Sequence, residues 1–114
     1  MPTIINLEQV EILKTYGGQE MVKESFTIFV EEAEGIMSRC KKTIGNGNYE
    51  ELSEAAHSLK GSAITLGIVK LGDAAHNLEQ DCKQNNANQI ATTFKLVENY
   101  FEEFMENYQT ILEL

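Results

Sequence analysis

A histidine, a lysine and a glycine lie close together in the middle of the chain, within the segment AHSLKGSAITLG from Ala56 to Gly67. Lys60 follows His57 by three positions, and Gly61 follows it by four. Residues three and four positions apart lie on the same face of a helix. This spacing predicts an imidazole with a cation beside it and no side chain crowding it on the following turn, which suits a histidine that another molecule must reach.

The same segment predicts a helix whose apolar side lies away from His57. Apolar residues recur at steps of three and four, which is typical of a helix packed along one side; they are Leu52, Ala55, Ala56, Leu59, Ala63 and Leu66. At about 100° per residue, His57 lies roughly opposite the middle of this stripe. Its neighbours on the open face are Ser53, Glu54, Lys60, Gly61 and Ile64. We therefore expect an exposed histidine rather than a core residue.

Gly61 is an unfavourable residue for the interior of a helix, where glycine costs roughly 1 kcal/mol relative to alanine. This cost suggests that Gly61 has a role at this position that a larger side chain would block. Gly61 could clear the approach for the active site of a partner, or it could simply let two helices pack closely. Gly67 is more simply explained as a helix stop.

The sequence around His57 resembles the motif of histidine-containing phosphotransfer (HPt) domains. The matching residues are His57-Ser-Leu59-Lys60-Gly61-Ser62-Ala63, followed by Leu66-Gly67. The run from Phe26 to Ala33 and the segment from Leu71 to Leu78-Glu79 also resemble the family. Members are four-helix bundles that relay a phosphoryl group in multistep two-component signalling. The resemblance covers most of the chain and implies this fold and this activity.

His57 has the chemistry that such a relay needs, because a neutral imidazole is a good nucleophile at about pH 7. Its second ring nitrogen must donate a hydrogen bond that fixes the tautomer, and the phosphoryl charge must be offset nearby. Lys60 is the candidate for that charge, with an ordinary solvated lysine as the alternative. Glu79, at the edge of the next apolar stripe, is a candidate acceptor for the imidazole, with a helix-surface carboxylate as the alternative.

The resemblance also implies the partners. His57 would accept a phosphoryl group from an aspartyl phosphate on one receiver domain and pass it to the aspartate of another. The receivers would belong to response regulators or to hybrid sensor histidine kinases. The divalent metal of such transfers would come with the receiver, so we expect no cofactor in this chain. Ser53, Glu54 and Ile64 would form the docking surface beside His57.

Composition limits the other functions open to the chain. Its 114 residues predict one domain over residues 1–114, and its net charge of −9, from 18 acidic and 9 basic residues, disfavours nucleic acid and anionic membranes as partners. No apolar run has the length of a membrane span, and the N-terminus lacks a signal pattern, so we expect a cytoplasmic protein. We also expect the domain to be a monomer. Without a GxxxxGK[ST] loop or a glycine-rich kinase lid, we expect a phosphotransfer protein that does not phosphorylate itself from ATP.

Apolar periodicity predicts an all-α fold, an antiparallel up-down four-helix bundle with a short extra N-terminal helix. The short helix begins at Asn6 and ends at Gly17 and Gly18. The expected long helices are Gln19–Thr43, Asn48–Leu66, one from Ile68 to before a polar loop at Gln84–Asn88, and Gln89–Leu112. The buried stripe of the last runs from Ile90 to Leu112 and includes Met105. Cys40 and Cys82 lie on two different stripes, as small buried hydrophobic residues.

The sequence is also compatible with two alternative functions. Glu54-Ala-Ala-His57 and Asp73-Ala-Ala-His76 approximate the Glu-x-x-His spacing of di-iron bundles, but both histidines lie off their apolar stripes, and His76 is interpreted as a surface residue. The second alternative is a helical adaptor that binds receiver domains or kinases without being phosphorylated. Both it and the relay predict binding, and only the relay predicts transfer.

Overall fold

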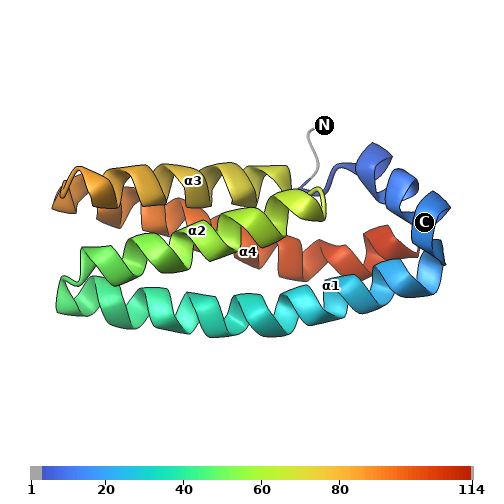
Figure 1. Cartoon of the computed structure of the whole chain (residues 1–114), viewed down its shortest axis with the longest axis horizontal. Coiled ribbons are helices and arrows are strands. Elements are labelled where there is room, and N and C mark those ends of the chain that lie inside the picture. Colours follow the sequence, from blue (N-terminus) through green and yellow to red (C-terminus); the bar gives the residue numbers. More distant parts are fainter. Residues whose placement is uncertain (1–3, 114) are drawn as a thin grey trace.

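Four helices account for most of the chain in the computed structural model, which describes residues 4–113 (Figure 1). They are α1 (Leu7–Asn46), α2 (Tyr49–Thr65), α3 (Val69–Lys83) and α4 (Ala87–Leu112). Short turns join them, so successive helices run in opposite directions along the bundle (Figure 1). The predicted all-α bundle is confirmed. None of these helices, within residues 4–113, combines the length and apolar character that crossing a bilayer requires.

The predicted short N-terminal helix is present as the first part of α1. Gly18 has φ 85° and ψ 162°, a backbone conformation open mainly to glycine, and it breaks α1 into two helical parts. The first part crosses one end of the bundle (Figure 1). The predicted end of the long helix at Thr43 is wrong, because α1 continues through Gly45 to Asn46 and ends at Gly47 with φ 69°. The left-handed glycine, rather than the first glycine, ends the helix.

Asparagine side chains begin two of the other helices. Asn48 accepts a hydrogen bond from the backbone N–H of Glu51 at the start of α2, and its amide donates to the Glu51 carboxylate, which is the predicted capping arrangement. Asn86 accepts from the backbone of Gln89 and begins α4. The last helix therefore begins at Ala87, earlier than the predicted Gln89. At the other end of α2, Gly67 has φ 80° and is the stop that the sequence predicts.

The core is built from the predicted apolar stripes. Phe104 of α4 is fully buried, with ring centroids 5.3 Å from Phe29 and 6.1 Å from Phe26. Cys40 and Cys82 are buried free thiols, and burial raises the pKa of each to about 11. Such thiols stay protonated and unreactive, in line with their interpretation as small hydrophobic residues. The prediction that Met105 belongs to the buried stripe of the last helix is wrong, because its side chain is 36% exposed.

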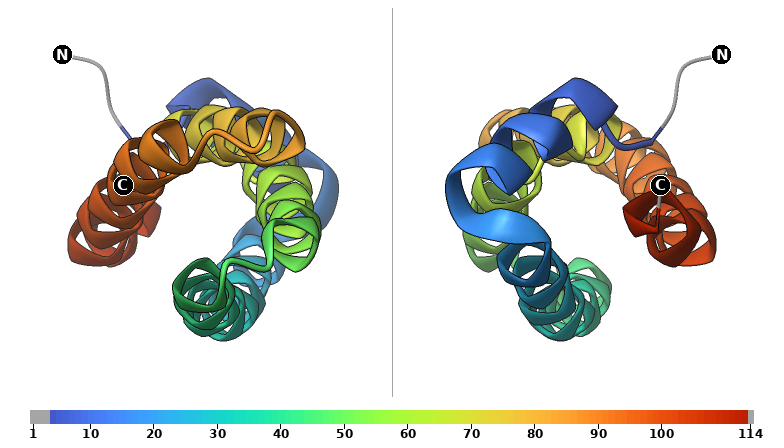
Figure 2. Two further views of the ribbon diagram at one scale, coloured as in Figure 1. Left: turned by 90° about the vertical axis from the view of Figure 1, so that its left-hand side faces the viewer. Right: turned by 90° about the vertical axis from the view of Figure 1, so that its right-hand side faces the viewer.

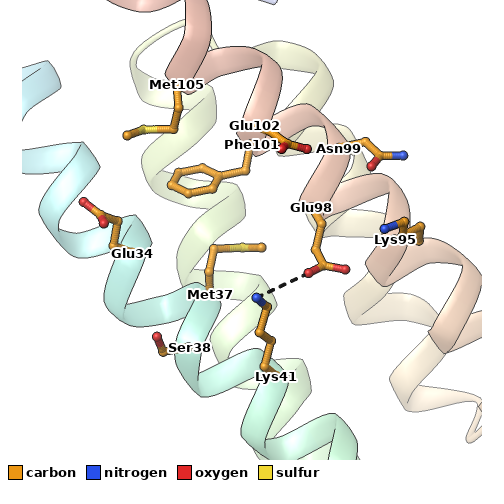
Figure 3. A pocket seen from close by; sticks show the side chains of 10 residues that line it. All are labelled: Glu34, Met37, Ser38, Lys41, Lys95, Glu98, Asn99, Phe101, Glu102 and Met105. Carbon is orange, nitrogen blue, oxygen red and sulfur yellow. Dashed lines mark ion pairs between the residues drawn. The ribbon is translucent and has the colours of Figure 1, made fainter.

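The four helices form an arc in cross-section rather than a closed square (Figure 2). α2 packs against α1 and α3, and α3 packs against α4, while the backbones of α1 and α4 lie further apart and meet through side chains such as Phe29 and Phe104. A groove of about 560 Å³ lies between α1 and α4, and the ion pair Lys41–Glu98, at 3.7 Å, bridges it (Figure 3). Met37, Phe101 and Met105 line the groove (Figure 3). The exposure of Met105 follows from this open side.

The N-terminal part of α1 is tied to the α2–α3 turn by hydrogen bonds. The Gln9 side-chain amide donates to the carbonyls of Ile64 and Thr65, at 3.0 and 2.9 Å, and the Asn6 backbone N–H donates to Gly67 at 2.7 Å. The last carbonyls of a helix have no partner within the helix. Gln9 therefore satisfies the C-terminus of α2, the helix that carries His57.

Replacing this side chain should loosen the turn. We expect Gln9→Ala to lower the free energy of unfolding by about 1–2 kcal/mol, since it removes two hydrogen bonds to helix-end carbonyls. Urea denaturation would measure the change. Gln19→Ala, which removes an exposed glutamine from the same helix, is the control and should change stability by less than about 0.5 kcal/mol. Equal effects of the two substitutions would show that Gln9 does not hold the turn.

Candidate functional site

His57 lies on the outer face of α2. Its side chain is 65% exposed, whereas Leu52, Ala56 and Leu59 on the other face are fully buried. The expectation of an exposed histidine is thus confirmed, because the apolar stripe fixes the rotation of α2 against its neighbours. The nucleophile that the sequence predicts is accessible to a second molecule.

Glu79 of α3 reaches across to this histidine. Its side chain is only 8% exposed, and one carboxylate oxygen, Oε2, lies 2.9 Å from the Nδ1 atom of His57. The alternative of an ordinary surface carboxylate is therefore wrong. α3 places Glu79 next to the buried Leu78 and Cys82, at the edge of the stripe that packs against α2. An acidic side chain at such an edge can point toward the neighbouring helix instead of the solvent.

Lys60 contacts the same carboxylate. Its Nζ atom lies 3.1 Å from Oε1 of Glu79, and its side chain is 25% exposed. Lys60 is consequently not a freely solvated lysine. Glu79 fixes it on the same face as His57, one turn further along α2, which is the arrangement that the spacing predicts.

Two more bases of α3 lie at a longer distance from Glu79. The Nδ1 atom of His76 is 3.9 Å from Oε1, and the Nζ atom of Lys83 is 3.7 Å from Oε2. His76 is half-exposed, as expected for a surface histidine. The sequence interpretation missed Lys83, although its position four residues after Glu79 on one helix is the spacing of an ion pair.

The bases around Glu79 keep it ionised. Burial by itself would raise the pKa of this carboxyl, but the hydrogen bonds from Lys60 and His57 and the charges of both bases outweigh burial, so the pKa lies below its ordinary value. An ionised carboxylate can only accept hydrogen bonds, and Nδ1 of His57 must therefore carry the proton of that contact. In the neutral imidazole, the lone pair is then on Nε2. Nε2 has no hydrogen-bond partner among residues 4–113.

The space above Gly61 is empty. A Cβ atom built on Gly61 would meet nothing within 4 Å, so close helix packing does not account for this glycine. Gly72 of α3 is different, because a Cβ there would come within 2.5 Å of the Ile64 side chain. Gly72 lets Ile64 lie against α3 while 44% of Ile64 stays exposed. The surface beside His57 thus has an opening at Gly61 and an apolar spot at Ile64.

The remaining predicted surface residues also lie on α2. Ser53 is partly buried, and Glu54 is exposed and forms an ion pair of 3.6 Å with Arg39 of α1. This outward position of Glu54, together with the exposure of both histidines, does not fit a di-iron core. Among residues 4–113, no three His, Cys, Asp or Glu side chains are grouped so that they could hold a metal ion.

Taken together, the side chains can support nucleophilic chemistry. The His57 ring is 65% exposed, its Nδ1 atom is held by a carboxylate, and a lysine ammonium lies one turn away. Two helices thus bring together a nucleophile, His57, a group that orients it, Glu79, and a group that stabilises charge, Lys60.

Comparison with known proteins gives a consistent answer. Two rice (Oryza sativa subsp. japonica) proteins, histidine-containing phosphotransfer proteins 1 and 2, are 23% and 24% identical to the chain over 109 and 110 residues, covering 94% of it and 74% of each relative. The crystal structure of a histidine-containing phosphotransfer protein from maize shares the fold, with a TM-score of 0.85 and 23% identity, over 96% of this chain and 83% of that one. The Hpt domain family model matches residues 24–113. The chain therefore belongs to the Hpt domain family, the histidine phosphotransfer intermediates of phosphorelays.

Proposed function

We propose that His57 is the residue that carries the phosphoryl group in this phosphorelay intermediate. The observation that supports this assignment best is the contact between His57 Nδ1 and the buried Glu79 carboxylate, at 2.9 Å. It leaves Nε2 as the nucleophilic atom on a ring that is 65% exposed. The chain has only two histidines, and His76 lacks a contact of this length.

The transfer follows from this geometry. The Nε2 lone pair attacks the phosphorus of an aspartyl phosphate, a P–N bond forms, and the P–O bond breaks with its electron pair leaving on the donor carboxylate. The imidazole gains positive charge in this step, which the Glu79 carboxylate stabilises. Lys60 stabilises the charge on the phosphoryl oxygens. The reverse sequence passes the phosphoryl group to the aspartate of a second receiver.

The partners in this proposal are receiver domains of response regulators or of hybrid sensor histidine kinases. They would dock over Ser53, Glu54 and Ile64, and the opening at Gly61 would admit their active site. The divalent metal would be supplied by the receiver, and this chain would use no cofactor and no ATP of its own. A cytoplasmic monomer is part of the same proposal.

The first test is to follow labelled phosphate from a phosphorylated receiver, with its divalent metal, onto the purified chain. We expect label that is labile in acid and stable in base, and none on His57→Gln. The matched control is His76→Gln, which should still accept label. Circular dichroism should show that both variants remain folded, because neither histidine is in the core.

Each other outcome has a definite meaning. Label on His57→Gln would show that another residue accepts the phosphoryl group. Unfolding of this variant would give His57 a structural role. Receivers that bind the wild-type chain without labelling it would favour the adaptor function instead.

A second prediction separates access from stability at Gly61. Gly61→Gln should raise the free energy of unfolding by about 0.5 kcal/mol, because glutamine favours a helix more than glycine does and the added Cβ atom meets nothing within 4 Å. It should nevertheless slow phosphoryl transfer by at least about tenfold, which corresponds to about 1.4 kcal/mol in the barrier, since its bulk lies beside His57. Transfer reactions quenched at successive times would measure this rate.

Gly35→Gln is the matched control for that experiment. Gly35 is also an exposed helical glycine with open space around it, but it lies in α1. It should give the same gain in stability with an unchanged transfer rate. If Gly61→Gln transfers as fast as the control, steric access is not the role of Gly61.

A third prediction concerns the charge of Glu79. Glu79→Gln should be less stable than wild type by about 2 kcal/mol at about pH 7, through loss of charge-assisted hydrogen bonds. Because the folded-state pKa lies below the ordinary value of 4.5, the ionised carboxylate stabilises the fold fully above that value. This contribution is lost as the pH falls through the folded-state pKa. Urea denaturation at about pH 7 and about pH 3 should therefore show the difference shrinking in acid, and a constant difference would contradict an ionised Glu79.

A further inference from the structure

Four bases surround the Glu79 carboxylate in two pairs. Each oxygen has one short contact, with Lys60 at 3.1 Å on Oε1 and with His57 at 2.9 Å on Oε2. Each also has one longer contact, with His76 at 3.9 Å on Oε1 and with Lys83 at 3.7 Å on Oε2. The short contacts come from α2, whereas the longer contacts come from α3, the helix of Glu79 itself.

Lys60 has two tasks that compete for its ammonium group. In the resting protein Lys60 donates to Glu79, and in the proposed transfer it turns toward a phosphoryl group on Nε2 of His57. This phosphoryl group carries a charge of about −2. The departure of Lys60 would deprive a carboxylate that is only 8% exposed of one of its two close partners. Glu79 would keep His57 on Oε2, but its other oxygen, Oε1, would lose its close cation, which is unfavourable for a buried charge. A replacement cation at Glu79 would remove this penalty.

We propose that Lys83 is that replacement, a positioning residue that approaches Glu79 when Lys60 turns to the phosphoryl group on His57. This inference rests on the proposed role of His57. Lys83 needs to move by only about 1 Å to reach the usual distance of a charge-assisted hydrogen bond. Its side chain is 58% exposed, so neighbouring atoms leave it free to move.

Lys83 suits the exchange better than the other base of α3. A lysine ammonium is charged throughout the neutral range, while a histidine carries a charge only when protonated. Lys83 also lies one helical turn from Glu79, which keeps it within reach without movement of the backbone. The exchange thus uses two lysines for one carboxylate, one on each helix.

The experiment compares transfer rates at saturating phosphorylated receiver for wild type, Lys83→Gln and Lys83→Arg. Lys83→Gln should slow transfer onto His57 by about threefold to tenfold, in the lower part of the range of couplings between neighbouring groups. Receiver affinity should stay within about twofold of wild type, because Lys83 acts on the step and not on docking. Lys83→Arg should restore most of the rate. Lys95→Gln, which removes an exposed lysine of α4, is the control for net charge and should transfer like wild type.

A double-mutant cycle with Glu79→Gln identifies the route of the effect. If Lys83 acts through Glu79, adding Lys83→Gln to Glu79→Gln should slow transfer no further. An undiminished effect in that background would show that Lys83 acts directly on the phosphoryl group and would overturn the exchange. The melting temperature of unphosphorylated Lys83→Gln should match wild type, which separates the exchange from a structural role.

Failure of the inference can be told apart from failure of the proposed function. Wild type that accepts label on His57 while Lys83→Gln transfers equally fast overturns the exchange alone. Wild type that accepts no label overturns both.

Discussion

The contact between the buried carboxylate of Glu79 and the bases of α2 is the interaction on which the site depends. Burial raises the free energy of a lone carboxylate, so Glu79 is stable in its position only with His57 and Lys60 beside it. The same contact fixes the imidazole tautomer and holds the lysine on the exposed face. Glu79 therefore links the packing of α2 against α3 to the reactivity of the Nε2 atom of His57.

This contact requires α2 and α3 to hold a fixed rotation and a fixed register. Leu59 and Leu78 are fully buried and set the rotation of their helices. The tight turn at Gly67 sets the register, and it is held from outside by Asn6 and Gln9. The N-terminal part of α1 thus serves the site although it contributes no group to the chemistry. Its position across the α2–α3 turn lets it hold that turn in place.

Much of this arrangement could be predicted from the sequence, because it follows from features within single helices. The period of the apolar stripe placed His57 outside, and the composition of the turns located every helix. The ends of α1 and α4 were less predictable, since whether Gly45 or Gly47 ends a helix depends on which residue takes the left-handed conformation. The sequence named Glu79 as a candidate partner of His57 but could not decide between this contact and a surface carboxylate, because a residue at the edge of a stripe turns inward or outward according to its neighbour on another helix. Lys83 was missed for the same reason, as its relation to Glu79 matters only once Glu79 is known to be buried.

The charge at this site also differs from that of the chain as a whole. The protein carries a net charge of −9, which repels anions on average. Two lysines lie beside the one carboxylate of Glu79, so the group of side chains in contact with Glu79 has a positive balance even with both histidines neutral. A local cationic spot on an acidic surface attracts a phosphoryl group to one place and disfavours it elsewhere. The excess of bases over acids at Glu79 therefore does more than stabilise the fold. A single lysine would neutralise the Glu79 carboxylate equally well, but it would leave no positive charge for the incoming phosphoryl group.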